Sequence, residues 1–292
     1  MNVREIVRPN PLDPPEPWER PYTRPAGEFF YEYRYAGHPF VPRAPEDVPP
    51  GALAELRDVC GIDSHAEVFV IPASVRFTSS GGRKVITPTQ VLAIGPRAVA
   101  LWAEWPRAGI AVSIGLGDLA YLEDVVILLY GRLSFFSARA RLTIRYNTVA
   151  RRWLEPSLLA LRKRISCARG DLPRAGAQPP VLPYKWDVIL HSPFLDLGDG
   201  TPPVHRYYAT APRNRRLPSK GQLLVLSAAE LIYVRDSQDP MMFYGTDRFL
   251  FPRSRMESVR AERRVLELTC NGADVSLAMP QPLMETAVGW LA

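Results

Sequence analysis

The sequence contains few of the residues on which most catalytic and metal-binding motifs depend. Its 292 residues include four histidines and three cysteines. The cysteines are Cys60, Cys167 and Cys270, which lie far apart and form no CxxC pair. Their odd number and wide spacing argue against a disulfide framework or a zinc knuckle. The motifs HExxH, GxSxG and GxxxxGKS/T are also absent. We therefore expect a non-catalytic protein without a cofactor, and an enzyme whose site is assembled from distant residues stays open as an alternative.

The sequence also lacks a long uninterrupted hydrophobic run. Its most apolar long stretch, Ala108–Gly131, is interrupted by Asp118, Glu123 and Asp124, whereas a membrane-spanning helix needs roughly 20 predominantly apolar residues. The N-terminus, MNVREIVRPNPLDPPEPWERP, is too polar and proline-rich for a signal peptide. We predict no transmembrane segment and a cytoplasmic location, with peripheral contact to a membrane as the alternative.

Lysine is scarce: there are 4 lysines beside 32 arginines, and the formal net charge is +6. A GC-rich coding bias accounts for such a skew, while a functional interpretation would point to nucleic acid or an anionic membrane. Hydrophobic residues make up 47% of the chain, which is ordinary for globular domains. Since domains usually run about 100–200 residues, the length predicts two of them.

Residues 1–65 are predicted to form a proline-rich arm followed by a short helix. Residues 1–50 hold 12 of the 30 prolines, and proline disfavours regular helix and central strand. Within the arm, Tyr31, Tyr33 and Tyr35 share one face if the chain is extended. They are candidates for binding a partner or for anchoring the arm on the core. The short helix is expected over Pro50–Cys60, with Gly61 ending it.

Residues 66–166 have the pattern of strands followed by a helix. Alternating or continuous apolar runs bounded by turn residues predict the strands. The helix is Val149–Ser166, which is amphipathic, and its regular part is expected to begin at Pro156. The predicted strand segments are Glu67–Phe77, Gln90–Ile94, Ala98–Ala103, Val125–Phe136 and Leu142–Asn147.

After a Pro/Gly/Arg-rich linker over residues 167–183, residues 184–292 are predicted to form a second strand-rich region. Its first predicted strand segment is Trp186–His191, and the region ends in a helix over Leu283–Leu291.

The two regions share a common order of segments, which suggests an internal duplication. Val91–Trp102 can be laid over Leu223–Val234, and Leu142–Tyr146 over Val275–Met279. In the same comparison, Gly117–Leu122 corresponds to Pro252–Val259, and Leu133–Phe136 corresponds to Leu266–Thr269. The offset between corresponding segments is about 132–137 residues throughout.

This order of elements resembles the pleckstrin-homology-like (PH-like) superfold. The stretches Leu128–Arg132 and Arg145–Thr148 (LLYGR and RYNT) are similar to segments of uncharacterised bacterial members. The resemblance implies a mainly β (α+β) chain with two modules, over residues 66–166 and 184–292. Each would be a bent antiparallel β-sandwich or barrel of seven strands closed by a C-terminal helix.

Two candidate sites follow from clusters of charged residues. In lipid-binding PH domains a basic loop holds inositol phosphates, and the resemblance places comparable loops in both halves. The histidines and aspartates of HSPFLDLGDGTPPVH could hold a divalent ion, although such residues also form ordinary hairpin loops. The basic candidates are Arg83, Lys84, Arg213, Arg215, Arg216 and Lys220, and the metal candidates are His191, Asp196, Asp199 and His205.

A third cluster, Asp118 with Glu123 and Asp124, could in principle perform acid–base chemistry. No histidine or arginine partner is visible nearby in the sequence, so we interpret these acids as part of a solvated loop. The leading functional hypothesis is a cytoplasmic adaptor that binds a protein partner through a sheet edge or a groove beside a helix. Binding to anionic lipid, or less favourably nucleic acid, through the basic loops is the alternative.

Overall fold

Antiparallel strands are the most abundant element of the fold, which confirms the predicted mainly β class. None of the helices in the described part is long and apolar enough to cross a membrane. The computed structural model describes residues 20–21, 38–77, 84–104, 109–127, 130–166, 182–192, 203–210, 220–236 and 245–291.

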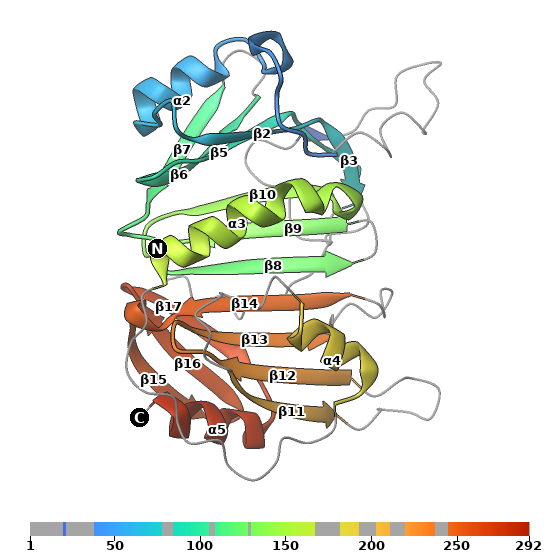
Figure 1. The fold of residues 1–292 in the computed structure, drawn as a ribbon, viewed down its shortest axis with the longest axis vertical. Coiled ribbons are helices and arrows are strands. Elements are labelled where there is room, and N and C mark those ends of the chain that lie inside the picture. The colour runs from blue at the N-terminus through green and yellow to red at the C-terminus, as the bar shows by residue number, and fades with distance from the viewer. Residues whose placement is uncertain are drawn as a thin grey trace.

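A seven-stranded sheet forms the centre of the molecule (Figure 1). Its order is β10-β9-β8-β14-β13-β12-β11. At its middle, β8 pairs with β14 from Leu122 opposite Leu250 to Val126 opposite Thr246, so strands from the two halves of the chain form one continuous sheet. The strands are β8 Tyr121–Ile127, β9 Tyr130–Phe136, β10 Arg141–Asn147, β11 Val204–Thr210, β12 Lys220–Leu226, β13 Glu230–Asp236 and β14 Thr246–Pro252.

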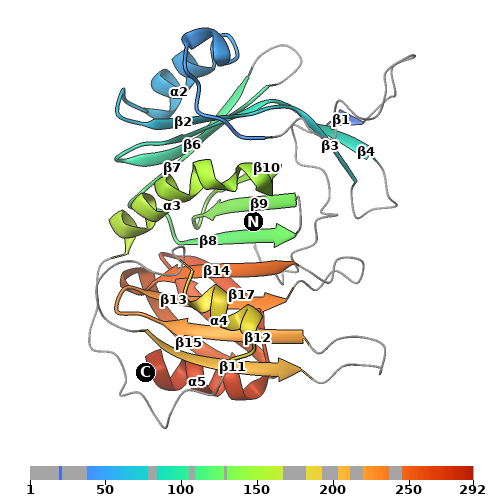
Figure 2. The ribbon, with the colours of Figure 1, turned by 45° about the vertical axis from the view of Figure 1, so that its right-hand side comes forward.

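Three smaller sheets complete the β structure. A four-stranded sheet, β2-β5-β6-β7, lies at one end of the molecule, and a three-stranded sheet, β15-β16-β17, lies near the other (Figure 1). A short sheet, β1-β4-β3, extends away from the four-stranded sheet (Figure 2). The strands are β1 Arg20–Pro21, β2 Glu67–Ile71, β3 Ser74–Phe77, β4 Lys84–Thr87, β5 Gln90–Ile94, β6 Ala98–Ala103, β7 Ile110–Gly115, β15 Met256–Glu262, β16 Val265–Cys270 and β17 Ala273–Ala278.

Helices pack against these sheets. Of the described helices, α2 (Ala52–Cys60) alone lies on the face of the four-stranded sheet that is turned away from the main core. It ends at Gly61, whose positive φ of 61° favours glycine. Helices α3 (Arg151–Ile165) and α4 (Tyr184–Leu190) lie on the same face of the seven-stranded sheet (Figures 1 and 2). Helix α5 (Gln281–Leu291) packs against β15 and β11.

The central strands β5 and β6 are apolar except for Gln90, because both of their faces are covered. Leu92 and Leu101 face the main core, which continues beneath α3 and α4. Val91 and Trp102 point the other way and pack under α2. A separate core lies between β11–β14, β15–β17 and α5.

The same succession of elements occurs twice along the chain. In the first half, β2, β5, β6 and β7 form four strands, β8–β10 form three, and α3 follows; the β3–β4 hairpin is inserted after β2. In the second half, β11–β14 form four strands, β15–β17 form three, and α5 follows.

Three predicted elements differ from the structure. The single predicted strand segment Val125–Phe136 spans parts of two antiparallel strands, β8 and β9. The segment Trp186–His191 is not a strand, because Tyr184–Leu190 is helical and buries Trp186 and Ile189, three residues apart, against the sheet. Helix α3 begins at Arg151 and not at Pro156. A proline there removes only one hydrogen bond, and burial of Leu154 holds the preceding turn in place.

Candidate functional site

Most of the predicted binding residues lie outside the described part of the chain, and their roles stay predictions. Of the basic candidates, Lys84 begins β4 and Lys220 begins β12, so these two belong to different sheets. The candidates outside the described residues are Tyr31, Tyr33, Tyr35, Arg83, Asp196, Asp199, Arg213, Arg215 and Arg216.

The two described members of the predicted metal site, His191 and His205, lie close enough to interact. His191 follows α4 and is exposed, with its Nδ1 3.3 Å from Oδ1 of Asp187. Burial and the nearby charge of His191 lower the pKa of His205 on β11. Within the described residues, no group of three or more histidine, cysteine or acidic side chains could hold a metal ion. The metal hypothesis therefore depends on Asp196 and Asp199 and stays a prediction.

The structure corrects the interpretation of Glu123 and Asp124 as part of a solvated loop. Both residues lie in β8, next to the β8–β14 junction, and both are buried. Only Asp118 lies in an exposed turn, before the strand begins. Because successive side chains of a strand point to opposite faces, the two acids enter different environments, and each has arginine partners.

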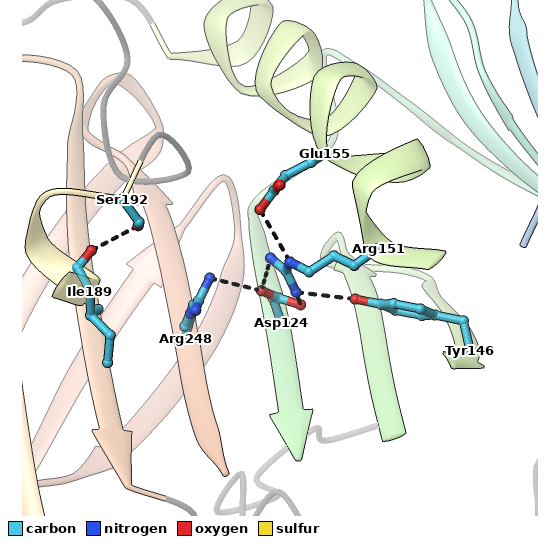
Figure 3. A network of polar contacts seen from close by, with 7 residues as sticks. All are labelled: Asp124, Tyr146, Arg151, Glu155, Ile189, Ser192 and Arg248. Atoms are coloured by element: carbon cyan, nitrogen blue, oxygen red, sulfur yellow. Dashed lines mark hydrogen bonds and ion pairs between the residues drawn. The ribbon is translucent and has the colours of Figure 1, made fainter. Parts of the chain in front are cut away.

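Asp124 lies on the α3 side of the sheet between two guanidinium groups (Figure 3). Arg151 of α3 donates to both of its carboxylate oxygens, at 2.9 and 2.7 Å. Arg248 of β14 approaches one of these oxygens at 3.8 Å. Burial alone would raise the pKa of Asp124, but the charge and hydrogen bonds of Arg151, with the charge of Arg248, hold this pKa below its usual range.

The partners of Arg151 extend this network. Its guanidinium also donates to the hydroxyl of Tyr146 on β10 at 3.2 Å and to Glu155 at 3.3 Å. A separate hydrogen bond lies on the other side of Arg248, at the end of α4. There the Ser192 hydroxyl donates to the carbonyl oxygen of Ile189 at 2.7 Å (Figure 3). Residues from α3, β8, β10 and β14 thus meet around one carboxylate.

Glu123 lies on the opposite face of the sheet and belongs to a second buried group. Its Oε1 accepts from Arg132 of β9 at 3.0 Å, and nearby Asp247 of β14 accepts from Arg235 of β13 at 3.1 Å. Burial, followed by the negative charge of Asp247, raises the pKa of Glu123 to about 8, although Arg235 and Arg141 oppose this shift. Burial also raises the pKa of Asp247 to about 6.

This arrangement supports a structural role more than an acid–base reaction. In the described part of the chain, the ion pairs of Glu123 and Asp124 are with arginines and not with histidine. Arginine stays protonated and does not relay protons. The two groups instead connect the halves, because both include residues of β8 and β14.

Sequence reasoning did not find the arginine and aspartate partners in these groups. The available signal was the presence of charged residues inside otherwise apolar strands, since a buried charge requires a partner. The partners missed are Arg132, Arg151, Arg235, Asp247 and Arg248.

Comparison with known proteins adds no further information about this site. No family model matches the chain, and neither a curated protein nor a solved structure matches it.

We expect the free energy of unfolding to fall as the pH rises from about 5 to about 8. Over this range folded Glu123, with a pKa of about 8, binds more protons than an unfolded glutamate, whose pKa is about 4.3. The folded state therefore loses stability with rising pH, on the order of 3 kcal/mol. Asp247 acts in the same direction up to about pH 6. Urea denaturation at four pH values measures the slope.

The variant Glu123→Gln should reduce this pH dependence because a glutamine side chain stays neutral. Glu262→Gln, on the exposed part of β15, is the matched control and should retain the slope. An unchanged slope in Glu123→Gln would show that Glu123 is ionised in the folded protein throughout this range.

Proposed function

We propose that the chain is a non-catalytic binding protein with two PH-like modules, over residues 66–166 and 184–292. Its second module accepts an extended, acidic segment of a protein partner along β15, beside α5. The repeated order of four strands, three strands and a helix supports the two modules. The segments paired in the sequence comparison also occupy corresponding strands: β5 and β6 correspond to β12 and β13, and β10 corresponds to β17.

The observation that carries the proposal is a difference between two corresponding sheet edges. In the first half, β8 is the first strand of the three-stranded part, and its outer edge is paired with β14. In the second half, β15 has the same position in the order of elements, and among the described strands its one neighbour is β16. In the first half, the outer edge of β8 is thus already paired with another strand. The corresponding edge of β15 in the second half is not paired with any described strand.

An open edge strand presents backbone N–H and C=O groups that can pair with an added strand. Most residues of β15 are exposed, including Glu257, Ser258 and Arg260, and α5 packs beside the strand. Backbone pairing would supply affinity, and the side chains next to the edge would supply specificity.

Positive charge at the end of β15 favours an acidic partner. Arg263 and Arg264 form the two-residue turn between β15 and β16, and both are exposed. Their φ angles are 45° and 70°, a conformation that Asn-Gly adopts far more easily than arginine. Residues held in an unfavourable backbone conformation often have a functional role, and here they place two guanidinium groups next to the edge.

Phage display of random octapeptides against the full chain tests the proposal. We expect selected peptides to be extended and rich in Asp and Glu. Hydrogen–deuterium exchange of the complex should show slower exchange in β15 and α5 than in the free chain. Protection confined to other elements would overturn the proposal.

Replacing Arg263-Arg264 by Asn-Gly provides a variant whose loss of binding is not explained by unfolding. Relief of the backbone strain should raise stability by about 1 kcal/mol, while affinity for the acidic peptide should fall at least tenfold because both charges are lost. Arg139→Gln, in the exposed turn between β9 and β10, is the control and should bind as the wild type does. Equal affinity of the Asn-Gly variant would exclude these arginines from the site.

A further inference from the structure

A cavity of about 270 Å³ lies between α2 and the outer face of the four-stranded sheet. The segment Pro42–Val48 and the loop Ile62–Ala66 form its other walls. The cavity lies on a different part of the molecule from β15 and from the charged groups around β8. It therefore belongs neither to the proposed binding edge nor to the buried ion pairs. Its volume is slightly below the range of roughly 300–1,000 Å³ that is typical of sites for drug-sized ligands.

The inner part of this cavity is apolar because small and aliphatic side chains meet there. Leu56 of α2, Ile62 and Val48 are buried and line it. Ala66 and Ala93 also line it, and their short side chains leave space that larger residues would fill.

Two arginines and one aspartate line the outer part of the cavity. Arg43 and Arg57 line it, and both are exposed. One acidic residue, Asp63, also lines it, but its Oδ1 accepts a hydrogen bond from the backbone N–H of His65 at 2.9 Å. Asp47, beside the cavity, accepts from the backbone N–H groups of Arg43 and Ala44 at 2.8 and 3.1 Å. Both carboxylates thus accept hydrogen bonds from backbone N–H groups of their own turns.

We infer that this cavity binds a short aliphatic carboxylate. The hydrocarbon chain would occupy the apolar part, lined by Leu56, Ile62 and Ala93, and the carboxylate would contact Arg43 and Arg57. Guanidinium groups match the planar geometry of a carboxylate and can bind it in a bidentate manner. The cavity volume limits the chain to roughly six to eight carbon atoms.

A series of carboxylates of increasing length measures how much of the chain is buried. We would titrate the full chain with butanoate, hexanoate, octanoate and decanoate by isothermal calorimetry. Affinity should rise about fourfold for each methylene that enters the cavity and stop rising near octanoate, when the cavity is full. A steady rise through decanoate, or no binding at any length, would overturn the inference.

Matched ligands and variants separate the contribution of the charge from that of the hydrocarbon chain. Arg57→Gln and Arg43→Gln should each weaken octanoate about tenfold and leave binding of 1-octanol, which has no charge, unchanged. Ala66→Leu should fill the cavity and abolish binding of both ligands without lowering the unfolding temperature. Arg139→Gln is the control and should bind octanoate normally. An equal effect of Arg57→Gln on octanoate and octanol would contradict the proposed carboxylate contact.

Discussion

Replacing Arg162 by methionine should lower the free energy of unfolding by about 3–5 kcal/mol. Arg162 of α3 and Glu230 of β13 form an ion pair at 2.6 Å, and both side chains are fully buried. Ser166 also donates to this carboxylate at 2.8 Å. Methionine has a similar length but no charge, so it would leave Glu230 buried without its cation. Urea denaturation monitored by circular dichroism measures the loss.

Two further variants establish that the loss comes from the unpaired charge. Lys163→Met changes the next residue of α3, which is exposed, and should change stability by less than about 0.5 kcal/mol. The double variant Arg162→Met with Glu230→Met removes both charges and should recover most of the stability, since apolar groups often replace a buried ion pair at little cost. A double variant as unstable as Arg162→Met would show that packing, and not the charge, is responsible.

The elements that the sequence predicted well are those with local signals. Strands β5 and β6 were predicted at their observed bounds, Gln90–Ile94 and Ala98–Ala103. Apart from Gln90 at the start of β5, both are apolar runs, and a Gly-Pro-Arg turn separates them. Helix α2 was predicted to within two residues, since Gly61 marks its end. These signals require only neighbours in the sequence.

The segment Trp186–His191 was misassigned because a short apolar run fits either a helix or a strand. Its helical state depends on a distant contact. The indole of Trp186 covers Gly221 of β12 so closely that a Cβ atom at Gly221 would lie 2.4 Å from the ring. The local pattern gives no information about this partner, which lies in another strand.

The candidate site was missed for the same reason. Glu123 and Asp124 are adjacent in sequence, but their side chains lie on opposite faces of β8. The arginines that contact Asp124 come from α3 and β14, and the pairing of β8 with β14 joins segments from different halves of the chain. No local periodicity indicates which strands pair at the junction, so the acids were interpreted without their partners.

The β8–β14 junction gives the second large effect that we expect. At pH 7, Asp124→Asn should lower the free energy of unfolding by about 3–5 kcal/mol. The neutral amide would leave Arg151 and Arg248, now without their shared counter-charge, facing each other in a site that is largely buried. Hydrogen–deuterium exchange should also be faster in β8 and β14, because the network connects these two strands.

The pH dependence of this loss distinguishes the ion pairs from simple packing. Arg151 and Arg248 hold the pKa of Asp124 below its usual range, so the stability that its charge contributes is present above about pH 4 and is lost as the pH falls through the folded pKa. The difference between wild type and Asp124→Asn should therefore shrink in acid. Asp118→Asn, in the exposed turn that precedes β8, is the control and should change stability by less than about 0.5 kcal/mol. A difference that stays constant down to pH 2 would mean that Asp124 stabilises the junction through its shape, because an ionic contribution must disappear when the carboxylate is protonated.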